Sequence, residues 1–181
     1  MAESFKPFIW FFAVLAAVGL ALSILSHIAA LLGQQGPLGS YSWVLHIGIF
    51  VVWIPAVLVS QRLTAEVARK DFWKAALRAT PSWMKYMVYG FFGYAVLNFA
   101  FFITQAPSKG GSGPMPPAVV RGFSGHWMAF YAAAMAILYS AAHAKDLGAS
   151  RRCLSGHAVG PLAKFCERCG QLVEDSPENR S

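Results

Sequence analysis

Four long stretches of this sequence contain no Asp, Glu, Lys or Arg: residues 8–32, 43–60, 86–105 and 126–143. An α-helix needs about 20 apolar residues to cross the roughly 30 Å hydrocarbon core of a bilayer. A chain of 181 residues is too small to bury four such helices inside one soluble core. We therefore expect an all-α integral membrane protein, with four transmembrane helices in a bundle and the lipid bilayer as their solvent.

Composition narrows the class further. Charged residues make up 13% of the chain, against about 25% in typical soluble domains. Three cysteines are too few for a secreted scaffold held by disulfides. The first apolar run is much longer than the apolar part of a cleaved signal peptide, which has about 7–15 residues. We therefore expect this run to remain in the protein as its first membrane span.

The basic residues are distributed unevenly over the segments outside these runs. Thirteen of the fifteen lie before the first run, between the second and third runs, or in the C-terminal tail. The other two, Lys109 and Arg121, lie between the third and fourth runs. Because Lys and Arg accumulate on the cytoplasmic side of membrane proteins, we expect both termini in the cytoplasm.

The connecting segments differ in character. Residues 33–42 are short and uncharged, which predicts a hairpin between the first two spans. Residues 62–80 hold good helix formers and no Gly or Pro, which predicts an interfacial helix on the inner leaflet. A solvated extension of the second span is an open alternative. Residues 106–125 are rich in Gly, Pro and Ser, and we expect them to lack regular structure.

The tail, residues 149–181, follows the membrane domain at 1–148 and contains a metal-binding pattern. The spacing C-x3-H-x8-C-x2-C is formed by Cys153, His157, Cys166 and Cys169. Zinc prefers four tetrahedral thiolate and imidazole ligands, which two closely spaced pairs can supply. Gly156 and Gly170 stand where the two pairs need tight turns with positive φ. A knuckle of this size has too little core to fold without metal.

This stretch resembles the short zinc ribbons attached to many prokaryotic membrane proteins. The matching residues are Cys153, Gly156, His157, Ala163, Lys164, Phe165, Cys166, Cys169 and Gly170. His157 replaces a more usual Cys, and Leu154 replaces a more usual Pro. The resemblance implies one structural zinc ion on the four ligands and a protein of the prokaryotic inner membrane. We also expect Phe165 and Leu172 to form a small apolar patch beside the metal.

Polar residues recur within the apolar runs at helical spacing. The first run has such a face at Ala16, Gly19, Ser23, His27 and Ala30, and the third at Gly90, Tyr94, Asn98 and Gln105. Groups of this kind usually face the bundle interior and join neighbouring helices, which is the favoured interpretation. An alternative uses His27, His46 and His126, which lie toward the outer membrane face, as ligands of a single b-type haem.

These features predict a protein that is not an enzyme. We expect an accessory or scaffold subunit of a larger membrane complex, with the zinc ribbon as a cytoplasmic docking module for a protein partner. Two alternatives stay open: a redox subunit with one haem, and a metal or redox sensor that uses the ribbon thiolates. Basic and acidic residues nearly balance in the tail, which disfavours a nucleic-acid partner. No pattern identifies a small-molecule substrate.

Overall fold

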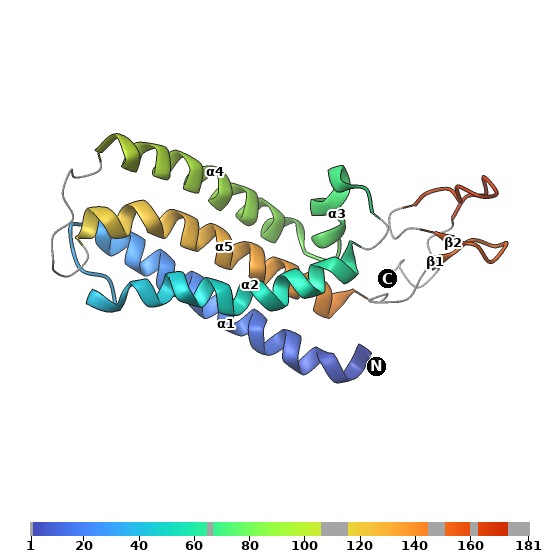
Figure 1. Cartoon of the computed structure of the whole chain (residues 1–181), viewed down its shortest axis with the longest axis horizontal. Helices are drawn as coiled ribbons and strands as arrows, with labels where there is room; N and C mark the ends of the chain where they lie inside the picture. Colours follow the sequence, from blue (N-terminus) through green and yellow to red (C-terminus); the bar gives the residue numbers. More distant parts are fainter. Residues whose placement is uncertain (1, 65–66, 106–115, 145–150, 160–162, 174–181) are drawn as a thin grey trace.

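The computed structural model describes residues 2–64, 67–105, 116–144, 151–159 and 163–173. Its long helices are α1 Ala2–Leu31, α2 Trp43–Leu63, α4 Ser82–Gln105 and α5 Pro117–His143. Figure 1 shows them packed alongside one another in an elongated bundle. The shorter elements are the 3-10 turns Gly39–Tyr41 and Arg69–Asp71, helix α3 Phe72–Ala76, and the antiparallel strands β1 Arg151–Arg152 and β2 Ala158–Val159. The predicted all-α architecture is confirmed.

Helix α5 occupies the centre of the bundle. It packs against α1, α2 and α4, and α1 also contacts α2. Three consecutive residues of α5, Ala132, Ala133 and Ala134, are all buried. Successive side chains on an α-helix point about 100° apart, so burial of three in a row means that neighbours surround most of the helix. Helix α4, by contrast, has α5 as its main neighbour.

The outer helices have the surface expected in lipid. Three helical segments, Lys6–Leu31, Gly39–Leu63 and Ser82–Thr104, are long and apolar enough to cross a membrane. Their large apolar side chains point outward; Phe11, Ile47 and Leu97 are 64%, 64% and 72% exposed. Soluble monomers rarely expose contiguous apolar surface on this scale. These three candidate transmembrane helices indicate a membrane protein, and their exposed apolar side chains are suited to contact with lipid.

The fourth predicted span differs from the other three. Helix α5 has the length of a span, but among the described residues it is not one of the three segments that reach the required apolarity. Its Trp, Tyr, His and Ser side chains lower its hydropathy. Many of these side chains are buried or bonded to other helices, so the lower hydropathy of α5 reflects its central position.

The prediction of one helix over residues 62–80 is wrong. Helix α2 ends at Leu63, where Arg78 donates a hydrogen bond of 2.8 Å to the Leu63 carbonyl. Thr64 donates its hydroxyl to the Ser60 carbonyl at 2.9 Å. The Arg78 bond satisfies a carbonyl that the helix end leaves without a partner, and the backbone N–H of Thr64 also donates to the Ser60 carbonyl at 2.9 Å. The chain continues as the turn Arg69–Asp71 and the five-residue α3, which form an elbow between α2 and α4.

The prediction that residues 106–125 lack regular structure is wrong for 117–125. Helix α5 begins at Pro117, whose ring favours the first helical position because no intrahelical N–H is needed there. Residues 106–115 lie outside the described part of the chain. Helices α1 and α4 also begin before the predicted spans, at Ala2 and Ser82.

Close helix contacts converge on Tyr131 of α5. Its hydroxyl donates to the Leu45 carbonyl of α2 at 2.8 Å. A Cβ added at Gly19 of α1 would collide with the Tyr131 ring, and one added at Gly48 of α2 would collide with its hydroxyl. Two glycines on facing helices therefore make room for one buried aromatic side chain.

The predicted polar faces are confirmed for α1 and only in part for α4. On α1, Ala16, Gly19, Ser23, His27 and Ala30 are all buried. On α4, Asn98 is buried, whereas Gly90 and Tyr94 are exposed. The buried face of α4 runs instead through Met84, Val88, Ala95 and Asn98. The side chain of Gln105 lies outside the description.

Candidate metal centre

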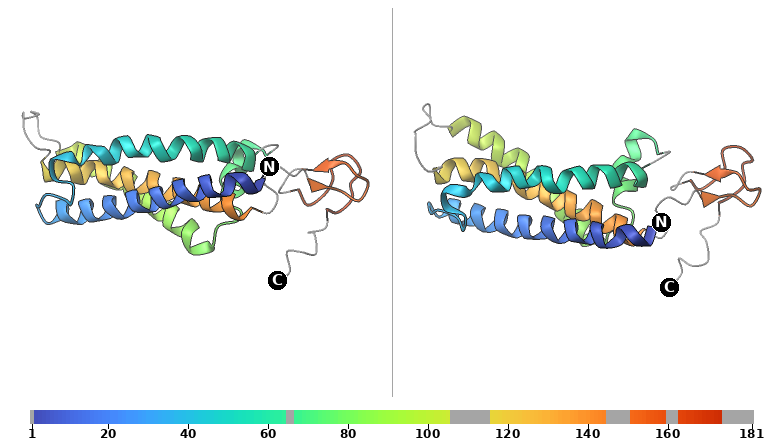
Figure 2. Two further views of the ribbon diagram at one scale, coloured as in Figure 1. Left: turned by 90° about the horizontal axis from the view of Figure 1, so that it is seen from below. Right: turned by 60° about the horizontal axis from the view of Figure 1, so that its bottom comes forward.

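Two small hairpins supply the four predicted ligands. In the first, β1 pairs with β2 through Arg151 with Val159 and Arg152 with Ala158. In the second, Phe165 and Leu172 form an antiparallel bridge. In each hairpin, one ligand pair lies in the turn region between the paired residues. Local hydrogen bonds therefore position both ligand pairs. Figures 1 and 2 show these hairpins beyond the end of the bundle at which the N-terminus lies.

Glycines close both turns. The N–H of Gly156 donates to the Cys153 carbonyl at 2.8 Å, and the N–H of Gly170 donates to the Cys166 carbonyl at 2.7 Å. Gly156 has φ of 81° and Gly170 has φ of 70°. Residues with a Cβ rarely adopt this left-handed conformation. The predicted requirement for glycine at these two positions is confirmed.

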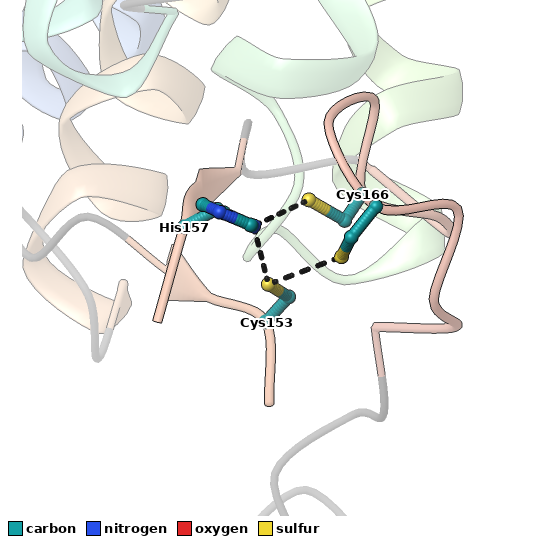
Figure 3. Close-up of side chains that lie close together, drawn as sticks. Cys153, His157 and Cys166 are labelled. Carbon is teal, nitrogen blue, oxygen red and sulfur yellow. Dashed lines mark hydrogen bonds between the residues drawn. The ribbon is translucent and has the colours of Figure 1, made fainter. Parts of the chain in front are cut away.

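The four ligand atoms converge on one point (Figure 3). The Sγ of Cys153 lies 3.6 Å from Nδ1 of His157 and 3.7 Å from Sγ of Cys169. The Sγ of Cys166 lies 3.8 Å from the same imidazole nitrogen. With metal–ligand bonds of about 2.0–2.3 Å, a tetrahedral site separates its ligand atoms by about 3.5–3.8 Å. Three of the pairs have this spacing, and all four ligand atoms lie within 4.8 Å of one another, so the group could hold a metal ion.

Backbone hydrogen bonds shape the acidity of the thiols. Burial raises the pKa of Cys153, but N–H groups of His157 and Ser155 outweigh it, so the net pKa is lowered. Burial also raises the pKa of Cys166, and N–H groups of Arg168 and Cys169 again make the net pKa lower than usual. For Cys169, a backbone bond from Gln171 lowers the pKa, but burial and the two neighbouring thiols make the net pKa higher. The local hydrogen bonds therefore favour the thiolate form at Cys153 and Cys166 and disfavour it at Cys169.

A small core covers one side of the site, whereas Cys169 is exposed and His157 is partly buried. Cys153 and Cys166 are buried together with Val159 and Val173, and Ala163 packs against this cluster. The predicted apolar pair Phe165 and Leu172 does not form this core, because these side chains are 59% and 57% exposed. The residues that follow them, Cys166 and Val173, point inward instead, as the alternation of side chains along a strand requires.

The histidines in the bundle do not gather into one site. His27 of α1 has Nδ1 at 2.7 Å from the Ser124 hydroxyl and Nε2 at 2.5 Å from the Tyr94 hydroxyl. Both ring nitrogens thus have protein partners, which join α1 to α5 and α4. A haem ligand needs a free nitrogen lone pair, so these bonds do not favour His27 as an axial ligand.

His46 and His126 do lie together, in an aromatic cluster between α2 and α5. Their ring centroids are 5.4 Å apart, and Trp43 and Phe123 contact His46. The indole N–H of Trp127 donates to Nδ1 of His46 at 3.1 Å, which leaves the proton of the neutral ring on Nε2. In that tautomer His46 also offers no free lone pair. Haem ligation by His27, His46 and His126 stays a prediction, and the hydrogen bonds of His27 and His46 do not support it.

The polar contacts that α4 and α5 make around His27 are not predicted by the sequence. Asn98 of α4 donates to the carbonyls of Arg121 and Gly122, at 2.8 and 3.2 Å. Ser124 donates to the Arg121 carbonyl at 3.1 Å. Burial of Asn and Ser in an apolar run signals such partners, but the partner helix cannot be read from one sequence.

No family model, no curated protein and no solved structure matches this chain. The candidate metal centre is therefore defined by its own residues and geometry. What these support is a Cys3His group that could hold a metal ion, attached to a set of membrane-type helices.

Proposed function

We propose that this chain is a four-span integral membrane scaffold that carries a structural zinc module. Helix α5 would be the fourth span, at about 40 Å long for its 27 residues. Its central position supports this, because α5 packs against α1, α2 and α4. If those three helices cross the bilayer, a helix packed between them lies at the same depth in the membrane. Its lower hydropathy is then expected, since it faces protein where the other helices face lipid.

The distribution of charge supports a cytoplasmic position for both termini. We call the two hairpins, residues 151–159 and 163–173, the metal module. The N-terminus, α3 and the metal module lie toward the same end of the bundle (Figures 1 and 2). The elbow at this end exposes Arg69, Lys70 and Lys74, with Trp73 also exposed. Basic residues mark the cytoplasmic side, and Trp is enriched at membrane interfaces.

Zinc is the metal that best fits the donor set. Three thiolates and an imidazole at tetrahedral spacing are typical of structural zinc. Four protein ligands leave no open coordination position for a substrate, which favours a structural role over catalysis.

The exposed glycines of α4 carry the proposal that the bundle serves as a scaffold. Nothing lies within 4 Å of a Cβ added at Gly90 or at Gly93. Tyr86 and Leu97 flank them on the same helical face and are 73% and 72% exposed. Small residues let transmembrane helices approach closely, so an exposed pair of glycines suits the packing of another helix. The partner would be a helix of a larger membrane complex.

The test is to purify the chain from native membranes in mild detergent, beside two α4 variants. We expect a partner at fixed stoichiometry with the wild type, lost in Gly90→Leu and retained in Val96→Leu. Val96 is also exposed on α4 but outside the glycine face. A wild-type chain that runs alone would contradict the proposal. Elemental analysis should find about one zinc per chain, and a Soret band would favour the haem-bearing redox subunit instead.

A further inference from the structure

The second hairpin of the metal module presents an apolar pair that no described residue covers. Phe165 and Leu172 are direct cross-strand partners, and both are more than half exposed. Their neighbours Cys166 and Val173 point into the metal core. The pair therefore lies on the side of the hairpin away from the core. Phe165 and Leu172 are not part of the core that folds the module, so folding does not explain why two large apolar side chains stand at this position.

Basic residues adjoin this pair in the sequence. Lys164 precedes Phe165 and Arg168 follows it within the same hairpin, and both are exposed, as is Glu167. Arg152 on the first hairpin is exposed as well, and Glu167 is the one acidic residue among the described residues of the module. We name Lys164, Phe165, Arg168 and Leu172 the hairpin patch. Apolar and aromatic side chains beside Lys and Arg are the combination that binds anionic membrane surfaces.

The chain itself holds the hairpin patch near a membrane. Residues 144–150 join α5 to β1, and even fully extended they span at most about 25 Å. A tether this short keeps the module close to the bilayer and raises its effective concentration there. The elbow at the same end of the bundle has the same chemistry, with Trp73 exposed beside Lys70 and Lys74.

We propose that the metal module docks on the cytoplasmic surface of the bilayer, with Phe165 and Leu172 inserted among anionic headgroups and with Lys164 and Arg168 facing lipid phosphates. The inference depends on the proposed membrane placement of the bundle. It adds a lipid-binding face to the module and leaves the first hairpin, with exposed Leu154, available to a protein partner. The metal then acts indirectly, because it holds the hairpin whose outer side contacts the lipid.

The test is photocrosslinking from the hairpin patch in the intact chain. Phe165→p-benzoylphenylalanine is reconstituted into nanodiscs of phosphatidylcholine alone or with about 30% phosphatidylglycerol. We expect lipid adducts by mass spectrometry, at least about threefold more with the anionic lipid, because the patch is basic. Adding Lys164→Glu and Arg168→Glu should remove most of that difference. Metal content measured on each sample confirms that the module has folded.

The matched control is Leu154→p-benzoylphenylalanine, which carries the probe on the first hairpin. Lipid adducts of equal yield from Leu154 would overturn the proposal, because they indicate a module with no preferred face. Absence of lipid adducts from the Phe165 probe would also overturn the proposal. The same probe can be activated in native membranes, where adducts with a protein and none with lipid would overturn it as well. Alkaline carbonate extraction separates the two failures. A chain released by carbonate refutes the membrane placement, whereas a retained chain without lipid adducts refutes the docking alone.

Discussion

The helical bundle and the metal module reach a defined structure by different physical routes. The bundle buries large side chains from four helices, including Trp127, Ile137 and Leu138 of α5. The module buries little besides two cysteines and two valines. A core that small cannot offset the conformational entropy of ordering the chain. A metal ion bound by the Cys3His group would supply the missing free energy. Each region should then respond to perturbations that leave the other unchanged.

Loss of a metal ligand should have the largest effect, confined to the module. In Cys166→Ser we expect the metal content to fall from about one ion per chain to near zero, because metal binding contributes about 10–16 kcal/mol in comparable peptides. Elemental analysis and protease sensitivity of the tail measure this loss, while the helical circular dichroism stays at the wild-type value. Leu154→Ala, at an exposed position of the same module, is the control. Full metal content in Cys166→Ser would refute the ligand assignment.

Acid should release the metal without unfolding the bundle. Protons compete with the metal for the three thiols, so occupancy falls as pH falls. Cys169, whose pKa is raised, gives up a proton on metal binding even near neutral pH. We expect the apparent affinity to fall about tenfold or more for each pH unit on acidification. Equilibrium dialysis with a chromophoric chelator measures it, and an affinity independent of pH would count against thiolate ligation.

A methyl group at Gly19 should destabilise the bundle and spare the module. The new Cβ in Gly19→Ala collides with the Tyr131 ring, and overpacking of this kind costs about 1–3 kcal/mol. Thermal unfolding in detergent should therefore move to lower temperature, with unchanged metal content. Gly90→Ala is the matched control, since open space surrounds that position. Equal effects of the two substitutions would mean that the α1–α5 contact is not as described.

Removal of one hydroxyl from the bundle should have the smallest effect. Tyr131→Phe keeps the ring between the helices and loses the bond to the Leu45 carbonyl. A typical buried hydrogen bond contributes about 1 kcal/mol to stability. The same thermal measurement resolves this loss against Tyr86→Phe, an exposed tyrosine of α4. If Tyr86→Phe lowers the unfolding temperature as much as Tyr131→Phe, the hydrogen bond from Tyr131 to the Leu45 carbonyl does not stabilise the bundle specifically.

Sequence reasoning worked best where the relevant contacts are local. The ligand set in the tail follows from spacing, since each pair closes through a turn of a few residues. The buried face of α1 follows from helical periodicity. The elbow after α2 was missed because its end depends on Arg78, which bonds to Leu63 from fifteen residues away. The start of α5 was missed because a Gly- and Pro-rich composition outweighed the helical preference of Pro117.

The amino-acid sequence alone determined that the chain has apolar segments of membrane-spanning length and that its tail carries four residues that could hold a metal ion. Apolar run length and ligand spacing are properties of short segments, so both can be recognised without the fold. Only the tertiary structure decided which helix is central and which polar groups meet. His27 lies 97 residues from Ser124 and 67 from Tyr94, and Tyr131 enters a space left by Gly19 and Gly48. Such contacts depend on how helices pack, and many arrangements of four apolar helices share the same local patterns.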